Sequence, residues 1–174
     1  MKKINKVIVG ISKCLYGESV RYDGTDKHDR QLLQSFGALV DLFPVCPEYD
    51  AGLSSPREPM HLEQSNDSVL LVGNDTPREY TPCLISWIQG CLVRIEAAHV
   101  SGFILKACSP SCAIGTAQMY TEKGLICGLT SGLFAAALQE NFPDMPIADE
   151  EELQDGRVRE VFLDNVVLYS CRKK

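Results

Sequence analysis

The sequence predicts an α/β fold in which a mostly parallel sheet carries helices on both faces, with one small β-hairpin insertion. Short apolar runs alternate along the chain with segments of helical period, which is the pattern of parallel strands connected by helices. Three of the apolar runs lead directly into cysteine-containing loops. With 174 residues and no internal repeat or linker, the chain is expected to form a single domain over residues 1–174.

The first part of the chain is predicted to run strand, loop, helix and strand. Lys6–Ser12 is apolar and strand-like, and Leu15–Asp26 is expected to be a loop. A helix over Lys27–Phe36 is expected to end at Gly37, because glycine tolerates the left-handed conformation that closes many helices. The second strand, Ala38–Val45, is followed by Cys-Pro-Glu, whose proline ends the strand ladder.

The middle of the chain is predicted to insert a hairpin before a long helix. Tyr49–Pro59 contains two prolines and a glycine and is expected to be a loop. His61–Gln64 and Ser68–Gly73 flank a short polar turn, as in a β-hairpin. Thr81–His99 has apolar residues at helical spacing, with its threonine as the expected cap and its proline in the first turn.

The last part of the chain alternates again between strands and helices. The expected elements are the strand Gly102–Lys106, the helix Ser131–Asn141, the strand Pro146–Ala148 and the helix Asp155–Tyr169. The acidic run Asp149–Glu152 is expected to be a solvated entrance to the last helix.

Cysteine placement is the strongest functional signal. Cys14, Cys46 and the pair Cys108 and Cys112 follow three predicted strands, so their thiols are expected at the carboxyl edge of the sheet, where open α/β sheets bind ligands. Three thiolates are one short of the four that close an Fe–S cube, which would leave one iron open to a substrate atom. Spacing alone leaves open which member of the pair is the third ligand. The remaining cysteines are expected to be small buried hydrophobic residues: Cys83, Cys91, Cys127 and Cys171.

Composition disfavours nucleic acid and membrane as partners. The net charge of −6 opposes binding to phosphates, although a local basic patch would still allow RNA. No apolar run reaches the roughly 20 residues of a membrane-spanning helix, and no signal peptide is recognised, so a cytoplasmic protein is expected. Eight cysteines then indicate metal binding, catalysis or burial rather than disulfides. Nothing in the sequence predicts an oligomeric state.

Three motifs resemble the signature of the thiouracil desulfidase family, an iron–sulfur domain formerly catalogued as one of unknown function. The motifs are Ser12-x-Cys14-Leu-x-Gly-x-x-Val-Arg-Tyr-Asp-Gly24, Pro44-Val-Cys-Pro-Glu48 with Gly52-Leu-x-x-Pro-Arg57, and Leu105-Lys-x-x-Ser-Pro-Ser-Cys112. The resemblance implies a Rossmann-like fold and a 4Fe-4S cluster with three cysteine ligands and one open iron. It also implies removal of sulfur from thiouracil or small thiouridine derivatives, giving uracil or uridine and hydrosulfide without net redox change.

The resemblance also assigns the ligands. They are Cys14, Cys46 and Cys112. Cys108 is then a bystander. Two residues beside ligands depart from the family pattern, because Lys13 stands where a small residue is expected and Ala113 where glycine is usual. Both departures bear on the shape of the pocket and therefore on substrate choice.

Three polar residues are candidates for the chemistry itself. Glu48 matches the catalytic carboxylate of the family, and a carboxylate near the cluster suits general acid–base catalysis; its alternative role is a capping or salt-bridging residue. Ser109 matches a serine that contacts substrate, although Ser-Pro-Ser is also an ordinary turn. Lys106 is expected to bind substrate or offset the charge of the cluster, or else to lie in solvent at the end of a strand.

The sequence is therefore compatible with three functions. The leading one is desulfidation of a small thiopyrimidine. The alternatives are desulfidation of 4-thiouridine in tRNA, which the acidic charge disfavours, and a non-enzymatic sensor module built on cysteines or an Fe–S cluster.

Overall fold

The computed structural model describes residues 6–37, 39–66 and 68–172. In chain order its elements are β1 (Val7–Ser12), α1 (Lys13–Tyr16), α2 (Arg30–Phe36), β2 (Val40–Val45), α3 (Pro47–Asp50), β3 (Met60–Ser65), β4 (Ser68–Gly73), α4 (Thr81–Ala97), β5 (Val100–Leu105), β6 (Ala117–Thr121), β7 (Ile126–Thr130), α5 (Leu133–Asn141), β8 (Ile147–Asp149), the 3₁₀ turn η1 (Glu152–Gln154) and α6 (Gly156–Arg172). Within these residues, no helix has both the length and the apolar character needed to cross a membrane.

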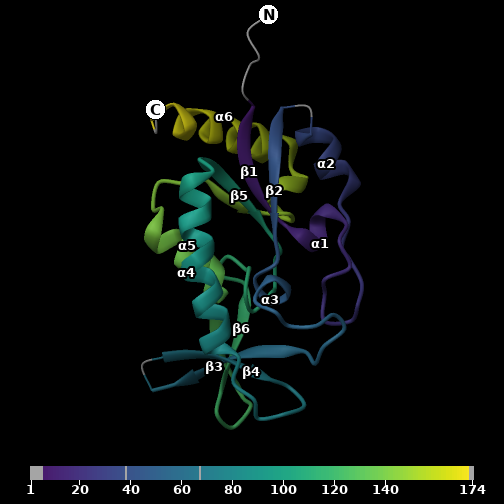
Figure 1. The fold of residues 1–174 in the computed structure, drawn as a ribbon, viewed down its shortest axis with the longest axis vertical. Coiled ribbons are helices and arrows are strands. Elements are labelled where there is room, and N and C mark those ends of the chain that lie inside the picture. Colours follow the sequence, from purple (N-terminus) through teal and green to yellow (C-terminus); the bar gives the residue numbers. More distant parts are fainter. Residues whose placement is uncertain (1–5, 38, 67, 173–174) are drawn as a thin grey trace, which may run out of the picture.

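The main sheet has the strand order β2-β1-β5-β8, and all of its pairings are parallel. The carboxyl ends of its strands therefore meet at one edge. Figure 1 shows this sheet in one half of the molecule and the strands β3, β4 and β6 at the opposite end. The α/β class predicted from the alternation of apolar runs is confirmed.

Helices cover both faces of the main sheet, as predicted. Consecutive residues of β5 show the two faces: Phe103 packs in the cluster that contains α4 and α5, whereas Ile104 packs in the cluster that contains α2 and α6. Both side chains are fully buried. The packing also explains Gly10, because the Phe103 ring lies 2.1 Å from where a Cβ would be placed.

A second, four-stranded sheet has the order β4-β3-β6-β7. The predicted hairpin corresponds to β3 and β4, which pair antiparallel. It is not isolated, because β3 also pairs in parallel with β6, which forms a second hairpin with β7. The sequence analysis missed β6 and β7. The largest apolar residues of β7, Ile126 and Leu129, are exposed. This hairpin therefore lacks the alternation of buried apolar and exposed polar residues by which a strand is identified in a sequence.

Several predicted boundaries need correction. Helix α2 begins at Arg30 rather than at residue 27, because the Asp29 side chain caps it by accepting from the Leu32 amide at 2.9 Å. The left-handed cap expected at Gly37 is wrong: its φ is −61°, and its amide donates to the Leu33 carbonyl. Ala38, the expected first residue of the second strand, lies outside the described residues.

The expected cap of α4 is also wrong. The Thr81 hydroxyl accepts from the Leu71 amide at 2.8 Å, so it ties α4 to β4 instead of capping the helix. The short helices α1 and α3 were not expected; each begins before one of the two predicted loops and extends two residues into it.

Burial of the four remaining cysteines is mixed. Cys91 is buried on the apolar side of α4, as predicted. The other three are exposed, which corrects the expectation for Cys83, Cys127 and Cys171.

Candidate functional site

A cavity of about 570 Å³ lies between the carboxyl edge of the main sheet and the second sheet. The cysteine loops after β1, β2 and β5 form one side of it. The second sheet contributes Met60 and Gln118, and Asn74 lines the cavity from the loop that directly follows β4. Because both sheets supply side chains, the cavity is a feature of their packing and not of either sheet alone.

The structure brings Cys14, Cys46 and Cys112 to the wall of this cavity. Cys14 is 8% exposed and Cys112 is 5% exposed, while Cys46 is half-buried. Cys14 lies in α1 directly after β1, and Cys46 is the residue that precedes α3 after β2. Cys112 lies in the loop that follows β5. The parallel pairing of β1, β2 and β5 thus brings three loops that are distant in the sequence together at the cavity.

All three thiols are largely shielded from solvent. Burial raises the pKa of the Cys14 thiol to about 11 and that of the Cys46 thiol to about 12. Burial also raises the pKa of Cys112 well above its ordinary value, and negative charge on Cys46 and Cys14 would raise it further. These thiols are therefore neutral at neutral pH unless a cation stabilises their thiolates, so metal binding here must release protons.

The arrangement does not fit a mononuclear ion. Among the described residues, no group of three or more His, Cys, Asp or Glu side chains is placed to hold a metal ion. A single zinc ion needs its sulfur ligands at about 2.3 Å, all around one centre. A cluster spreads its ligands over several iron atoms, so its ligands need not surround a single centre.

Cys108 also lines the cavity, but its environment differs from that of Cys112. Cys108 is exposed and has a left-handed backbone, with φ of 58°. The Ser109 hydroxyl accepts from the amides of Ser111 and Cys112, both at 3.2 Å, and thereby fixes the turn that buries Cys112. Its own hydrogen is left to donate.

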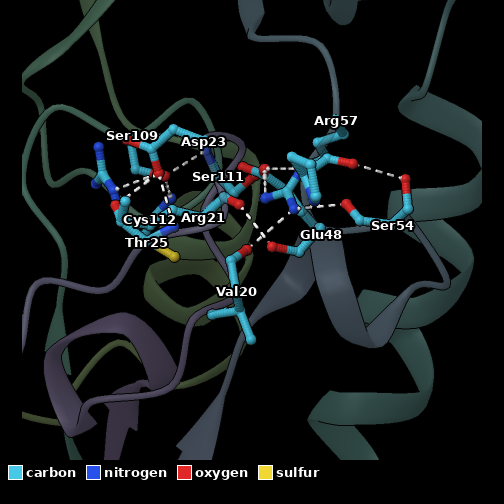
Figure 2. Close-up of polar contacts among 12 residues, drawn as sticks. Val20, Arg21, Asp23, Thr25, Glu48, Ser54, Arg57, Ser109, Ser111 and Cys112 are labelled. Atoms are coloured by element: carbon cyan, nitrogen blue, oxygen red, sulfur yellow. Dashed lines mark hydrogen bonds and ion pairs between the residues drawn. The ribbon is translucent and has the colours of Figure 1, made fainter.

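Glu48 is buried beside the cavity between two donors (Figure 2). Arg57 donates to Oε2 from Nε at 3.0 Å and from Nη2 at 2.5 Å, and the Ser111 hydroxyl donates to Oε1 at 2.8 Å. Arg57 also donates to the carbonyls of Val20 and Ser54, each at 3.0 Å. Glu48 therefore forms the salt bridge that was its alternative role, and its carboxylate is held in one orientation at the cavity wall.

Lys106 lines the cavity but does not lie free in solvent. Its ammonium forms an ion pair with Glu150 and donates to the Ala107 carbonyl at 3.1 Å. The other carboxylate oxygen of Glu150 accepts from the Ala107 amide at 2.7 Å. Asp149 and Glu150 are buried, so the expectation of a solvated acidic run is wrong for these two residues.

Sequence reasoning missed Ser111, Glu150 and Asp50, which hold the site together. Asp50 accepts from the Cys46 amide at 3.0 Å. A Cys-Pro-x-x-Asp spacing is compatible with such a contact, but the roles of Ser111 and Glu150 depend on partners 63 and 44 residues away in the chain.

Sequence and structure comparisons identify known proteins that are similar to this chain. The sequence model of the 2-thiouracil desulfurase family matches residues 9–150, a range that includes all three cysteine loops. An uncharacterized protein of Bacillus subtilis strain 168, YbbK, is 29% identical over 154 residues, which cover 83% of this chain and 97% of the relative. The solved structure of the 4Fe-4S-dependent thiouracil desulfidase TudS is similar with a TM-score of 0.67 and 27% identity, over 86% of this chain and 93% of that one.

Proposed function

The chain belongs to the 2-thiouracil desulfurase family, and from this premise we propose that it is a 4Fe-4S-dependent desulfidase of thiouracil or small thiouridine derivatives. The products would be uracil or uridine and hydrosulfide, without net redox change. The observation that carries the proposal is the placement of three buried or half-buried thiols from three loops on the wall of one cavity.

The donor set fits an iron–sulfur cluster. Thiolates are the soft ligands that such clusters use, and the proposed ligands are Cys14, Cys46 and Cys112. With three protein ligands, a bound 4Fe-4S cluster would supply one Lewis-acidic iron that polarises the thiocarbonyl group of a substrate. The exposure of Cys108 supports its exclusion from the ligand set.

Glu48 is the proposed proton carrier. It would take a proton from the water that adds to the ring carbon and return it when sulfur departs. The contacts with Arg57 and Ser111 support this role, since they hold the carboxylate at the cavity wall. A fixed carboxylate avoids the cost of orienting a mobile one for each turnover.

Ser109 and Lys106 are the proposed substrate contacts. The Ser109 hydroxyl has a hydrogen left to donate to a polar edge of the pyrimidine ring. Lys106 would approach the same ligand with its ammonium oriented by Glu150. The ion pair with Glu150 lowers the net charge that Lys106 presents, which suits contact with a neutral base.

Anaerobic reconstitution followed by a substrate panel tests the proposal. The protein should bind about four iron and four sulfide per chain and should bleach the thiocarbonyl absorbance of thiouracils or thiouridines while releasing hydrosulfide. The Cys14→Ala variant provides the inactive control. A loaded protein that consumes no thiopyrimidine would support a sensor module, and a colourless protein with one bound zinc would overturn the cluster itself.

A further inference from the structure

A chain of polar contacts joins two of the three cysteine loops. Lys13 directly precedes Cys14, and its Nζ lies 2.7 Å from Oδ1 of Asp50. The other oxygen of Asp50 accepts from the Cys46 amide at 3.0 Å. The residue beside Cys14 is thereby linked through a single carboxylate to the backbone of Cys46.

This ion pair differs from an ordinary surface salt bridge. The side chains of Lys13 and Asp50 are only 19% and 17% exposed, and Lys13 also lines the cavity. Its second acidic partner, Glu18, lies farther away at 3.7 Å and is 41% exposed. Partial burial reduces the screening of the Lys13–Asp50 pair by solvent and salt.

The two cysteine segments have little internal structure of their own. Cys14 lies in α1 and Cys46 precedes α3, and each helix has only four residues. Helices of this length have little stability by themselves. The pairing of β1 with β2 ends at Ser12 and Val45, and beyond it the bridge through Asp50 is a contact that holds the two segments together.

We infer that Lys13 and Asp50 are positioning residues that fix the separation of the Cys14 and Cys46 thiols and balance the charge beside them. The inference rests on the proposed function, since the thiols are taken to hold the cluster. It gives a role to Lys13, one of the two residues that depart from the family pattern, without assigning it any contact with substrate.

Two single-residue variants distinguish an effect on the position of the thiols from an effect on the charge beside them. Lys13→Ala and Asp50→Asn both break the ion pair, so each should release iron to a chelator about fivefold faster than wild type. Their effects on the reduction potential should be opposite. Lys13→Ala leaves an unpaired carboxylate that disfavours adding an electron, whereas Asp50→Asn leaves an unpaired ammonium that favours it.

Three comparisons complete the test. Lys13→Arg keeps the charge and should restore wild-type iron release. Glu18→Gln removes only the distant partner of Lys13, so it should also release iron at the wild-type rate. The double variant Lys13→Ala/Asp50→Asn should release iron no faster than the worse single variant. Each single variant already loses the whole Lys13–Asp50 ion pair, so the second substitution removes no further contact.

The measurements use the anaerobically reconstituted protein. Iron release is followed by the absorbance of a ferrous chelator, and potentials come from redox titration of the visible cluster absorbance. Wild-type release rates in both single variants, or potentials that shift in the same direction, would overturn the inference while leaving the proposed function intact. A wild-type protein that assembles no cluster would overturn the proposed function and this inference with it.

Discussion

Burial distinguishes the two cysteines of the loop after β5, and this difference predicts the outcome of single substitutions. Cys14→Ala, Cys46→Ala and Cys112→Ala should each abolish stable cluster binding, because each removes one of the three proposed ligands. Cys108→Ala should retain about four iron per chain, since the Cys108 side chain is exposed. Iron and sulfide assays after reconstitution and gel filtration decide this. Loss of iron in Cys108→Ala with retention in Cys112→Ala would reverse the assignment.

A substitution of Glu48 can distinguish an effect on catalysis from an effect on cluster assembly. Glu48→Gln keeps the size of the side chain and one carbonyl oxygen for its donors, but the amide cannot carry the proton. We expect wild-type iron content and a catalytic rate at least about 10²-fold lower, the lower end of general acid–base contributions. Steady-state kinetics on the reconstituted variant, with its melting temperature as a control for the lost Arg57 contact, provide the measurement. Near-normal turnover would mean that Glu48 only stabilises the segment after β2 through its contacts with Arg57 and Ser111.

The residues found from sequence are those whose position follows from the end of a strand. Cys14 and Cys46 come within two residues of the ends of two mostly apolar strands, so the parallel sheet alone predicts their location. Glu150 could not be found in this way. Its acidic neighbours suggest solvent, and only the pairing of β5 with β8 brings it to Lys106 and the Ala107 amide.

The same reasoning holds for whole elements. β1, β2 and β5 were predicted to within two residues because strands of a buried parallel sheet are nearly continuous apolar runs. β7 was missed because it is an edge strand with exposed apolar residues, and β6 because Ala117 is its single buried residue. The helices α1 and α3 were missed because four residues carry no helical period.

The connection between β4 and α4 has an acidic anchor that predicts a pH dependence of stability. The Glu58 carboxylate accepts from the Tyr80 hydroxyl at 2.6 Å and from the hydroxyl and amide of Thr76. The hydrogen bonds from Tyr80 and Thr76 lower the pKa of Glu58 from its ordinary value of 4.5 to about 2. Gly73 leaves room for it, because a Cβ there would lie 2.5 Å from the carboxylate.

A lowered folded-state pKa stabilises the fold above the ordinary pKa, and this stabilisation is lost as the pH falls toward about 2. Glu58→Gln should therefore have a lower melting temperature than wild type at neutral pH. The difference should shrink steadily as the pH falls from about 5 to about 2, the window set by the ordinary and the lowered pKa of Glu58. Thermal unfolding followed by circular dichroism provides the measurement, with the exposed Glu79→Gln as the matched control. A gap that stays constant with pH would contradict the anchor.

At the scale of the whole molecule, the cavity depends on two sheets with different tasks. The main sheet positions the cysteine loops, while Met60 and Gln118 of the second sheet and Asn74 after β4 complete the wall of the cavity. A volume of about 570 Å³ accommodates a small molecule and excludes a folded nucleic acid. Only an extruded nucleotide of a larger RNA could enter.

The net charge of −6 makes such an RNA substrate unfavourable, and this yields the last prediction. Binding tRNA requires cationic contacts to several phosphates, and affinity built on them falls steeply with salt. The loaded protein should desulfidate thiouracil or 4-thiouridine with a rate that changes less than about twofold between roughly 50 and 200 mM salt. It should leave 4-thiouridine in intact tRNA unmodified under the same conditions.

The free nucleoside is the matched control in that experiment, because it presents the same thiocarbonyl group without neighbouring phosphates. Mass spectrometry of digested tRNA and absorbance of the free nucleoside report the two reactions side by side. If tRNA were desulfidated as fast as the nucleoside at low salt, and more slowly as salt rises, a basic surface would have to recruit the RNA despite the overall charge. The nucleic-acid alternative would then replace the small-molecule one, while the cysteine ligands and the role of Glu48 would stand unchanged.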